Sequence, residues 1–228
     1  MPRIVDLTQP LSPETVLWPG SEPVAIEAVA TLEADGHFAQ VLRVPEHSGT
    51  HLDAPAHFVP GGATVDAIPV EALVVPCAVL DVRDRAAADP DFALGEPDLG
   101  AAEDRDGPIE PGSAVLLATG WDAHLSDAAR YLGGADPQQL RFPGFGAGAA
   151  RALVERGVVG LGIDTASVDR GRDTELPVHN TTLPAGLWHL EGLVGVAELP
   201  ARGATLFVGA VPVHGGSGAP ARVLAIAP

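Results

Sequence analysis

The chain has 228 residues, 46% of them hydrophobic, and a formal net charge of −17 at pH 7. The length suits one large domain or two small ones, and the hydrophobic content argues against intrinsic disorder. The negative charge repels nucleic acid and anionic lipid, so the sequence predicts neither nucleic acid nor a membrane as a partner.

Residue types that are rare or missing exclude further classes of protein. All 13 basic residues are arginine, which excludes Schiff-base chemistry and a phosphate-loop lysine. The single cysteine, Cys77, excludes an internal disulfide, and residues 1–6 do not resemble a signal peptide, so a cytoplasmic location is expected. Cys77 lies in the apolar run 77–80, where an inert buried thiol is expected. No apolar run approaches the ~20 residues of a membrane-spanning helix.

The N-terminal part of the chain predicts three strands. Residues 3–7 form the first, and 24–29 and 38–44 form a hairpin around a turn at 34–37. Trp18 lies between them in a loop beside proline and glycine, where a tryptophan usually packs against neighbouring side chains.

Three histidines and one aspartate then follow within eleven residues. Residues 50–53 read as a short strand, on which His51 and Asp53 point to the same face, about 6.5 Å apart. Gly49 allows a turn that brings His47 back toward the same point. Imidazole and carboxylate together suit zinc, manganese or iron, so this segment predicts a metal site.

The role of His57, four residues after Asp53, stays open from the spacing alone. It could be a fourth ligand, an acid/base beside the metal, or a residue that contacts a ligand. The choice matters because four protein ligands close a structural site, whereas a catalytic site keeps one position for water.

The rest of the chain predicts an α/β protein with many strands. Residues 84–112 are rich in acidic residues, proline and glycine and are interpreted as loop with one short helix near 99–104. Further strands are expected at 77–82, 113–118, 158–163, 205–213 and 221–226.

Two helices are expected between these strands. Asp122 is interpreted as the N-cap of a helix at 123–132, and Gly157 as the stop of a helix at 144–156. Asp164, directly after the strand at 158–163, is interpreted as a turn or cap residue.

His179 and Glu191 are candidates for a second group of metal ligands. Their separation of twelve residues proves little by itself. Glu191, however, stands between the apolar Leu190 and Leu193, where an unpaired carboxylate would be costly to bury and a metal would remove that cost. His189 is interpreted as structural.

These motifs resemble the cyclase family of metal-dependent hydrolases, which includes bacterial kynurenine formamidases and isatin hydrolases. Residues 47–58 are similar to its signature His-x-Gly-Thr-His-x-Asp-x-Pro-x-His-Phe. The segments around His179 and Glu191 resemble the stretch that supplies the family's second pair of metal ligands, and the glycine-rich turn at 215–220 resembles its terminal turn. The opening at 6–20 resembles that of the family, in which the aromatic residue, here Trp18, lines the substrate pocket.

The resemblance implies a fold and a site. The fold would be a single domain over 1–228, a β-rich α/β domain of the swivelling β/β/α type, assembled as a dimer or tetramer. His57 would transfer a proton, and two divalent ions would bind per chain, zinc before manganese. The metal ligands would be His47, His51 and Asp53 for one ion and Asp53, His179 and Glu191 for the other.

The expected activity is metal-dependent hydrolysis of an amide bond in a small molecule. An aryl formamide such as N-formylkynurenine is the first candidate, and a cyclic amide or lactone, as in isatin hydrolases, is the alternative. A third interpretation, from another class, is a non-catalytic binding module with a structural metal.

Overall fold

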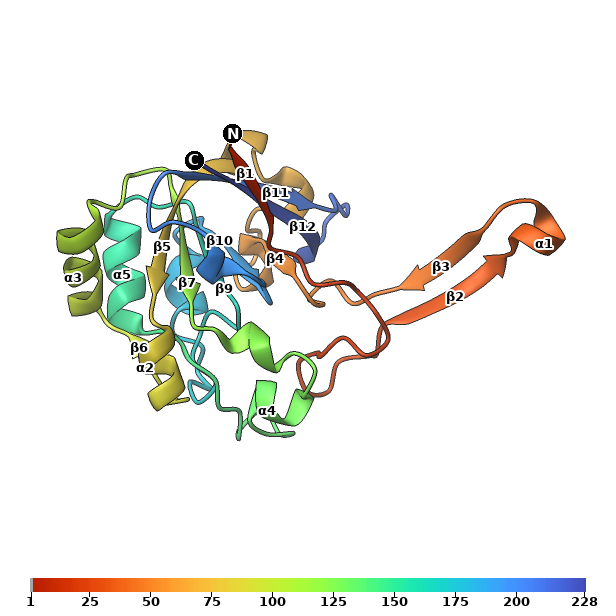
Figure 1. The fold of residues 1–228 in the computed structure, drawn as a ribbon, viewed down its shortest axis with the longest axis horizontal. Coiled ribbons are helices and arrows are strands. Elements are labelled where there is room, and N and C mark those ends of the chain that lie inside the picture. The colour runs from red at the N-terminus through yellow and green to blue at the C-terminus, as the bar shows by residue number, and fades with distance from the viewer. Residues whose placement is uncertain (1) are drawn as a thin grey trace.

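A computed structural model describes residues 2–228, and one large mixed sheet dominates it (Figure 1). In sheet order its strands are β1 (Arg3–Asp6), β12 (Gly218–Ala227), β11 (Ala204–Ala210), β5 (Val74–Asp81), β7 (Ala114–Ala118), β9 (Gly160–Ile163), β10 (Trp188–Glu191) and β4 (His51–Asp53). Strand β4 pairs with β10 on one side and with β12 on the other, so the sheet closes into a ring. Strands β5, β7, β9 and β10 run parallel, and the remaining pairings are antiparallel.

The helices are short, and the two longest cover the outer face of the parallel strands (Figure 1). The helices in chain order are α1 (Leu32–Asp35), α2 (Arg83–Ala88), α3 (Glu96–Asp106), α4 (Ala128–Leu132), α5 (Ala147–Glu155) and α6 (His179–Thr182), of which α3 and α5 are the longest. Leu99 of α3 and Leu153 of α5 share one buried apolar cluster with Leu117 and Ile163 of the sheet. Alternate residues of the same strands point the other way, into the ring. Among residues 2–228, no helix has the length and apolar character needed to cross a membrane.

Side chains from all parts of the ring fill its interior. Leu52 of β4, Leu190 of β10 and Leu206 of β11 are fully buried there, in the same cluster as Trp188 and Cys77. Burying a large apolar side chain stabilises a protein by roughly 1.5–3 kcal/mol. The packed interior therefore gives β4 and β10, which carry the site described below, a rigid support.

Cys77 provides a test of this packing. Its side chain is 3% exposed, and burial raises the pKa of its thiol to about 12. Because the thiolate is the reactive form, we expect a thiol reagent at neutral pH to modify none of the native protein and one group per chain in denaturant. A native protein that reacts as fast as the denatured one would contradict the buried position.

The region 84–112 differs from the expected loop. It forms α2, a two-residue strand β6 (Ala93–Leu94), and α3, which begins well before the short helix that was expected. The Asp98 carboxylate accepts a hydrogen bond from the Gly95 amide and caps the start of α3, and Leu99 is buried against the sheet. The acidic residues are thus the solvated face of a helix.

The expected helix at 123–132 is also wrong in its first half. A 3₁₀ turn covers Trp121–His124, and α4 begins only after Asp127, whose carboxylate accepts from the Arg130 amide and is the real N-cap. Asp122 instead accepts a hydrogen bond from Gly195, across the chain. The next helix, α5, begins at Ala147 and not at 144, because Gly144–Phe145 forms strand β8, which pairs with β6. The helix ends before Gly157, as predicted, and the φ of Gly157 is 71°.

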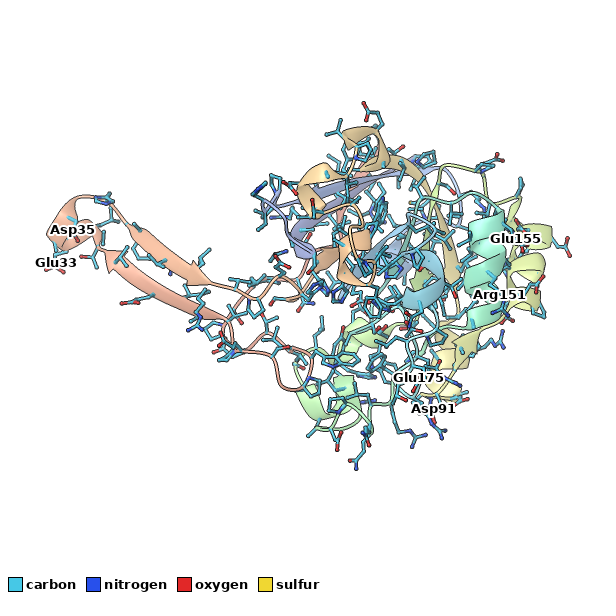
Figure 2. All side chains as sticks on the ribbon, turned by 180° about the vertical axis from the view of Figure 1, so that it is seen from behind. Glu33, Asp35, Asp91, Arg151, Glu155 and Glu175 are labelled. Carbon is cyan, nitrogen blue, oxygen red and sulfur yellow. The ribbon has the colours of Figure 1, made fainter. Side chains whose placement is uncertain are left out.

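The hairpin of β2 (Ala25–Ala30) and β3 (Ala39–Arg43) is confirmed, and it forms an arm that projects far from the ring (Figure 1). Its tip is the short helix α1, closed by Gly36 with φ of 74°. Figure 2 shows Glu33 and Asp35 at this tip, at the opposite end of the molecule from Arg151 and Glu155 of α5.

The prediction of a strand-rich α/β fold is therefore confirmed. What the structure shows is a mixed sheet closed into a ring and covered by few helices. The swivelling β/β/α arrangement, and the assignment of 1–228 to a single domain, stay predictions.

Candidate metal centre and pocket

The register of β4 against β10 builds the centre of the site. His51 lies opposite Glu191, and Asp53 lies opposite His189, with Leu52 and Leu190 between them. Because side chains alternate along a strand, the two leucines enter the core and the four polar side chains share the other face. The predicted strand at 50–53 thus places His51 and Asp53 side by side, and β10 adds Glu191 to them.

His47 reaches the same group through the turn that the sequence predicted. Gly49 has φ of 60°, and the returning chain places His47 Nδ1 2.6 Å from Asp53 Oδ1. His47 Nε2 lies 3.0 Å from the hydroxyl of Ser217, in the C-terminal glycine-rich turn. A Cβ at Gly218 would lie 2.6 Å from the His47 ring, so this turn needs glycine to let the imidazole pass.

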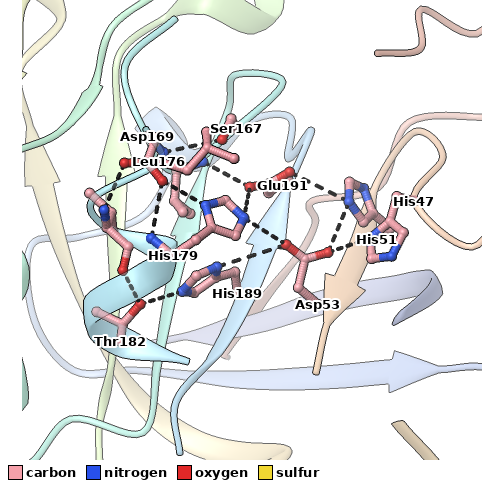
Figure 3. Close-up of polar contacts among 12 residues, drawn as sticks. His47, His51, Asp53, Ser167, Asp169, Leu176, His179, Thr182, His189 and Glu191 are labelled. Carbon is pink, nitrogen blue, oxygen red and sulfur yellow. Dashed lines mark hydrogen bonds and ion pairs between the residues drawn. The ribbon is translucent and has the colours of Figure 1, made fainter. Parts of the chain in front are cut away.

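His179, at the start of α6, comes to the other side of Asp53 (Figure 3). Its Nε2 lies 3.3 Å from Asp53 Oδ2 and 3.5 Å from Glu191 Oε1. Its Nδ1 lies 2.6 Å from Asp169 Oδ2, and the other carboxylate oxygen of Asp169 accepts from the amide of Val178. Asp169 is buried and orients His179; the sequence analysis gave it no role.

The donor atoms have the spacing of metal ligands. Ligands about 2.1 Å from a tetrahedral ion lie roughly 3.4 Å from each other. His51 Nε2 is 3.2 Å from Asp53 Oδ1 and 3.5 Å from Glu191 Oε2. On the other side, His179 Nε2 is 3.3 Å from Asp53 Oδ2 and 3.5 Å from Glu191 Oε1, which is nearly the same spacing. The residues present therefore fit divalent ions on both sides of the two carboxylates.

Burial and mutual contact shift the pKa values of this group. Burial favours neutral imidazole, but the hydrogen bond and charge of Asp53 outweigh it and raise the pKa of His51 to about 9. Asp169 and Asp53 likewise raise the pKa of His179 to about 10. Burial and the nearby Asp53 charge raise the pKa of Glu191 to about 7. The centre thus holds protons that a bound cation would displace at neutral pH.

His57 stands at the solvent side of the centre. It is the last residue of the 3₁₀ turn Pro55–His57, is exposed, and stacks its ring on that of His47 with centroids 4.0 Å apart. Desolvation of the ring, with the neighbouring His47 and His179, lowers the pKa of His57 to about 4. His57 is therefore neutral at pH 7 and can accept a proton.

A pocket of about 350 Å³ opens above these groups. Trp18 lies in its wall and contacts the ring of Phe142 edge to face, and a role for Trp18 in binding substrate stays a prediction. Trp121 lies outside the lining and donates its indole N–H to the carbonyl of Tyr131. Apart from the polar residues of the centre, the wall consists mainly of Val16, Leu17, Trp18, Phe58, Tyr131, Ala166 and Leu176. This volume suits a small aromatic molecule.

Two wall residues carry features that the sequence did not reveal. Leu176 has φ of 47°, a left-handed conformation that is uncommon for a residue with a Cβ and often marks functional sites. Tyr131 is buried, and its hydroxyl donates to the backbone carbonyl of Asp164. The Asp164 carboxylate accepts hydrogen bonds from the amides of Thr119 and Gly120. It therefore holds the turn after β7, in line with its interpretation as a turn residue.

Asp169 supplies a test of how His179 is oriented. Replacing Asp169 by asparagine keeps its shape but removes the charge that faces His179 Nδ1. Loss of such an outer partner typically costs 10–100-fold in metal affinity, and we expect zinc affinity to fall by about that factor. Competition with a chromogenic chelator measures it. Unchanged affinity would show that the backbone alone orients His179.

Comparisons with known proteins agree with this geometry. Residues 5–170 match the family model described as a putative cyclase. The chain is 31% identical to the isatin hydrolase of Roseibium aggregatum, over 99% of this chain and 92% of that protein. It is also 31% identical to the kynurenine formamidase of Salinibacter ruber, over 97% and 96% of the two chains. The solved structure of isatin hydrolase A from Ralstonia solanacearum superimposes with a TM-score of 0.94, at 33% identity, over 100% of this chain and 92% of that one.

The fold and the match over most of the sequence define the class of this protein as a cyclase-type hydrolase. The chain belongs to the putative cyclase family. The family predicted from residues 47–58 is thereby confirmed.

Proposed function

We propose that this protein is a metal-dependent hydrolase that opens a cyclic amide fused to an aromatic ring, an isatin-like substrate. The observation that carries the proposal is the buried His/Asp/Glu centre at the floor of an aromatic-walled pocket. The match to named isatin hydrolases in both sequence and structure supports the choice of substrate.

The donor atoms suit two divalent ions, and zinc or manganese fits the ligand types. Asp53 and Glu191 would help to hold the ions together with His51 and His179, because each carboxylate turns one oxygen to His51 and the other to His179. His47, in contact with Asp53 Oδ1, would complete the ligands on the His51 side. Such ions lower the pKa of a water molecule and polarise a carbonyl group.

The protein's own residues would orient the substrate and move the proton. Trp18 and Phe58 offer an apolar slot for a flat ring and exclude bulk water. Hydrolysis forms a C–O bond and breaks the C–N bond, and the leaving nitrogen needs a proton. His57, neutral at pH 7, would accept the proton from water and give it to that nitrogen.

An aryl formamide is the second candidate substrate. The kynurenine formamidase of similar identity and coverage supports it. The two substrates need the same chemistry and differ in whether the amide lies inside a ring.

Metal analysis combined with two hydrolysis assays tests the proposal. Protein loaded with zinc or manganese and freed of excess ion should retain about two ions per chain. It should hydrolyse isatin faster than N-formylkynurenine, and a chelator should abolish both activities. The reverse preference would favour the formamidase. Metal binding without hydrolysis of either compound, or of related cyclic amides and lactones, would favour a non-catalytic binding module.

A further inference from the structure

His189 has an unexplained nitrogen atom in the middle of the centre. The side chain is 0% exposed and lies on β10 directly opposite Asp53. Its Nε2 is 2.7 Å from the hydroxyl of Thr182 (Figure 3). Its Nδ1 is buried and has no hydrogen-bond partner among the residues that the structure describes. Buried polar atoms without a partner are rare and costly.

The hydrogen bonds around Thr182 indicate which nitrogen carries the proton. The Thr182 hydroxyl donates to the carbonyl of Val178 at 2.7 Å, so its oxygen is left to accept. The group opposite it, His189 Nε2, must then be the N–H donor. In a neutral imidazole the other nitrogen has only a lone pair. That lone pair, on Nδ1, faces Asp53 Oδ2 at 3.8 Å, and two acceptors that face each other need a cation between them.

We propose that His189 is a further metal ligand, through Nδ1, for the ion held beside His179; this rests on the proposed metal centre. Donor atoms of Asp53, His179, His189 and Glu191 all lie within 4.8 Å of one another. Four protein donors would fill a tetrahedral shell on the His179 side.

The proposal predicts unequal effects on two ions. Apo-protein is titrated with zinc against a chelator and with cobalt(II), whose visible spectrum reports the ligands. The wild type should bind two ions. His189→Ala should bind one ion as before and the other more than about tenfold more weakly, with a changed cobalt spectrum. His214→Ala, which removes an exposed imidazole paired with Asp66, is the matched control and should bind as the wild type does.

Other outcomes separate this inference from the proposed function. Two ions bound by His189→Ala with wild-type affinity and spectrum would overturn the role of His189 and leave the metal centre intact. A wild type that binds no ion would overturn the centre itself. If His189→Ala does not fold, His189→Leu fills the buried space. In addition, nitrogen NMR of the wild type should show the His189 Nδ1 signal shift on zinc addition, and an unmoved signal would refute ligation.

Discussion

Replacing Asp53 by asparagine is expected to remove bound metal from both positions and to abolish hydrolysis. Asp53 Oδ1 faces His47 and His51, and Oδ2 faces His179. Asparagine offers one oxygen and no charge, so it cannot serve both sides. Loss of a residue that only hydrogen-bonds to a metal ligand already lowers metal affinity by up to about 100-fold, so loss of a ligand shared by both ions should lower it further.

Elemental analysis and kcat/KM measure these effects together. Asp66→Asn is a suitable control, because Asp66 also contacts a histidine, the exposed His214, and neither residue belongs to the group of candidate ligands. The control should keep its metal and its activity. If Asp53→Asn retained two ions, the central position of Asp53 among the ligands would be wrong, whatever happened to the rate.

The parts of this centre that could be predicted from sequence are those encoded locally. His51 and Asp53 lie on one strand, and the alternation of side chains is enough to place them together. Gly49 similarly predicts the turn that brings His47 back toward His51 and Asp53. Glu191 could be suspected because a carboxylate between leucines needs a partner.

What could not be predicted depends on pairing between distant segments. His189 becomes a neighbour of Asp53 only through the register of β10 against β4, which no local pattern specifies. Asp169 meets His179 because a loop and α6 fold back on each other. The pocket wall has the same origin, since Phe58 follows the 3₁₀ turn Pro55–His57 and Tyr131 lies in α4, far apart in the sequence.

The errors in secondary structure have a related cause. Helix α3 contains Gly100 and many acidic residues, which weaken its helical pattern, and the burial of Leu99 against the sheet stabilises it. Asp122 has the chemistry of an N-cap, but a distant amide at Gly195 takes its carboxylate. Tertiary contacts decided both cases.

Replacing His57 by alanine is expected to lower kcat by about 10²–10⁴-fold, the usual contribution of a general acid–base residue, and to leave the metal content unchanged. His57 stacks on His47 and borders the pocket, where it can reach water and a leaving nitrogen. Its pKa of about 4 keeps the imidazole neutral at pH 7, so that one ring nitrogen has a free lone pair. His37→Ala, at the tip of the arm, is the control and should leave kcat unchanged.

The metal content of His57→Ala decides between the two roles that the sequence left open. Donor atoms of His47, Asp53 and His57 also lie within 4.8 Å of one another, so His57 is close enough to be a ligand. If His57→Ala lost one ion together with its activity, His57 would be a metal ligand, and no residue would then be assigned to proton transfer. Two retained ions with a slow rate would assign proton transfer to His57, and full activity would remove it from the mechanism. Because His57 is exposed while the other histidines of the centre are partly or fully buried, we expect the second of these results.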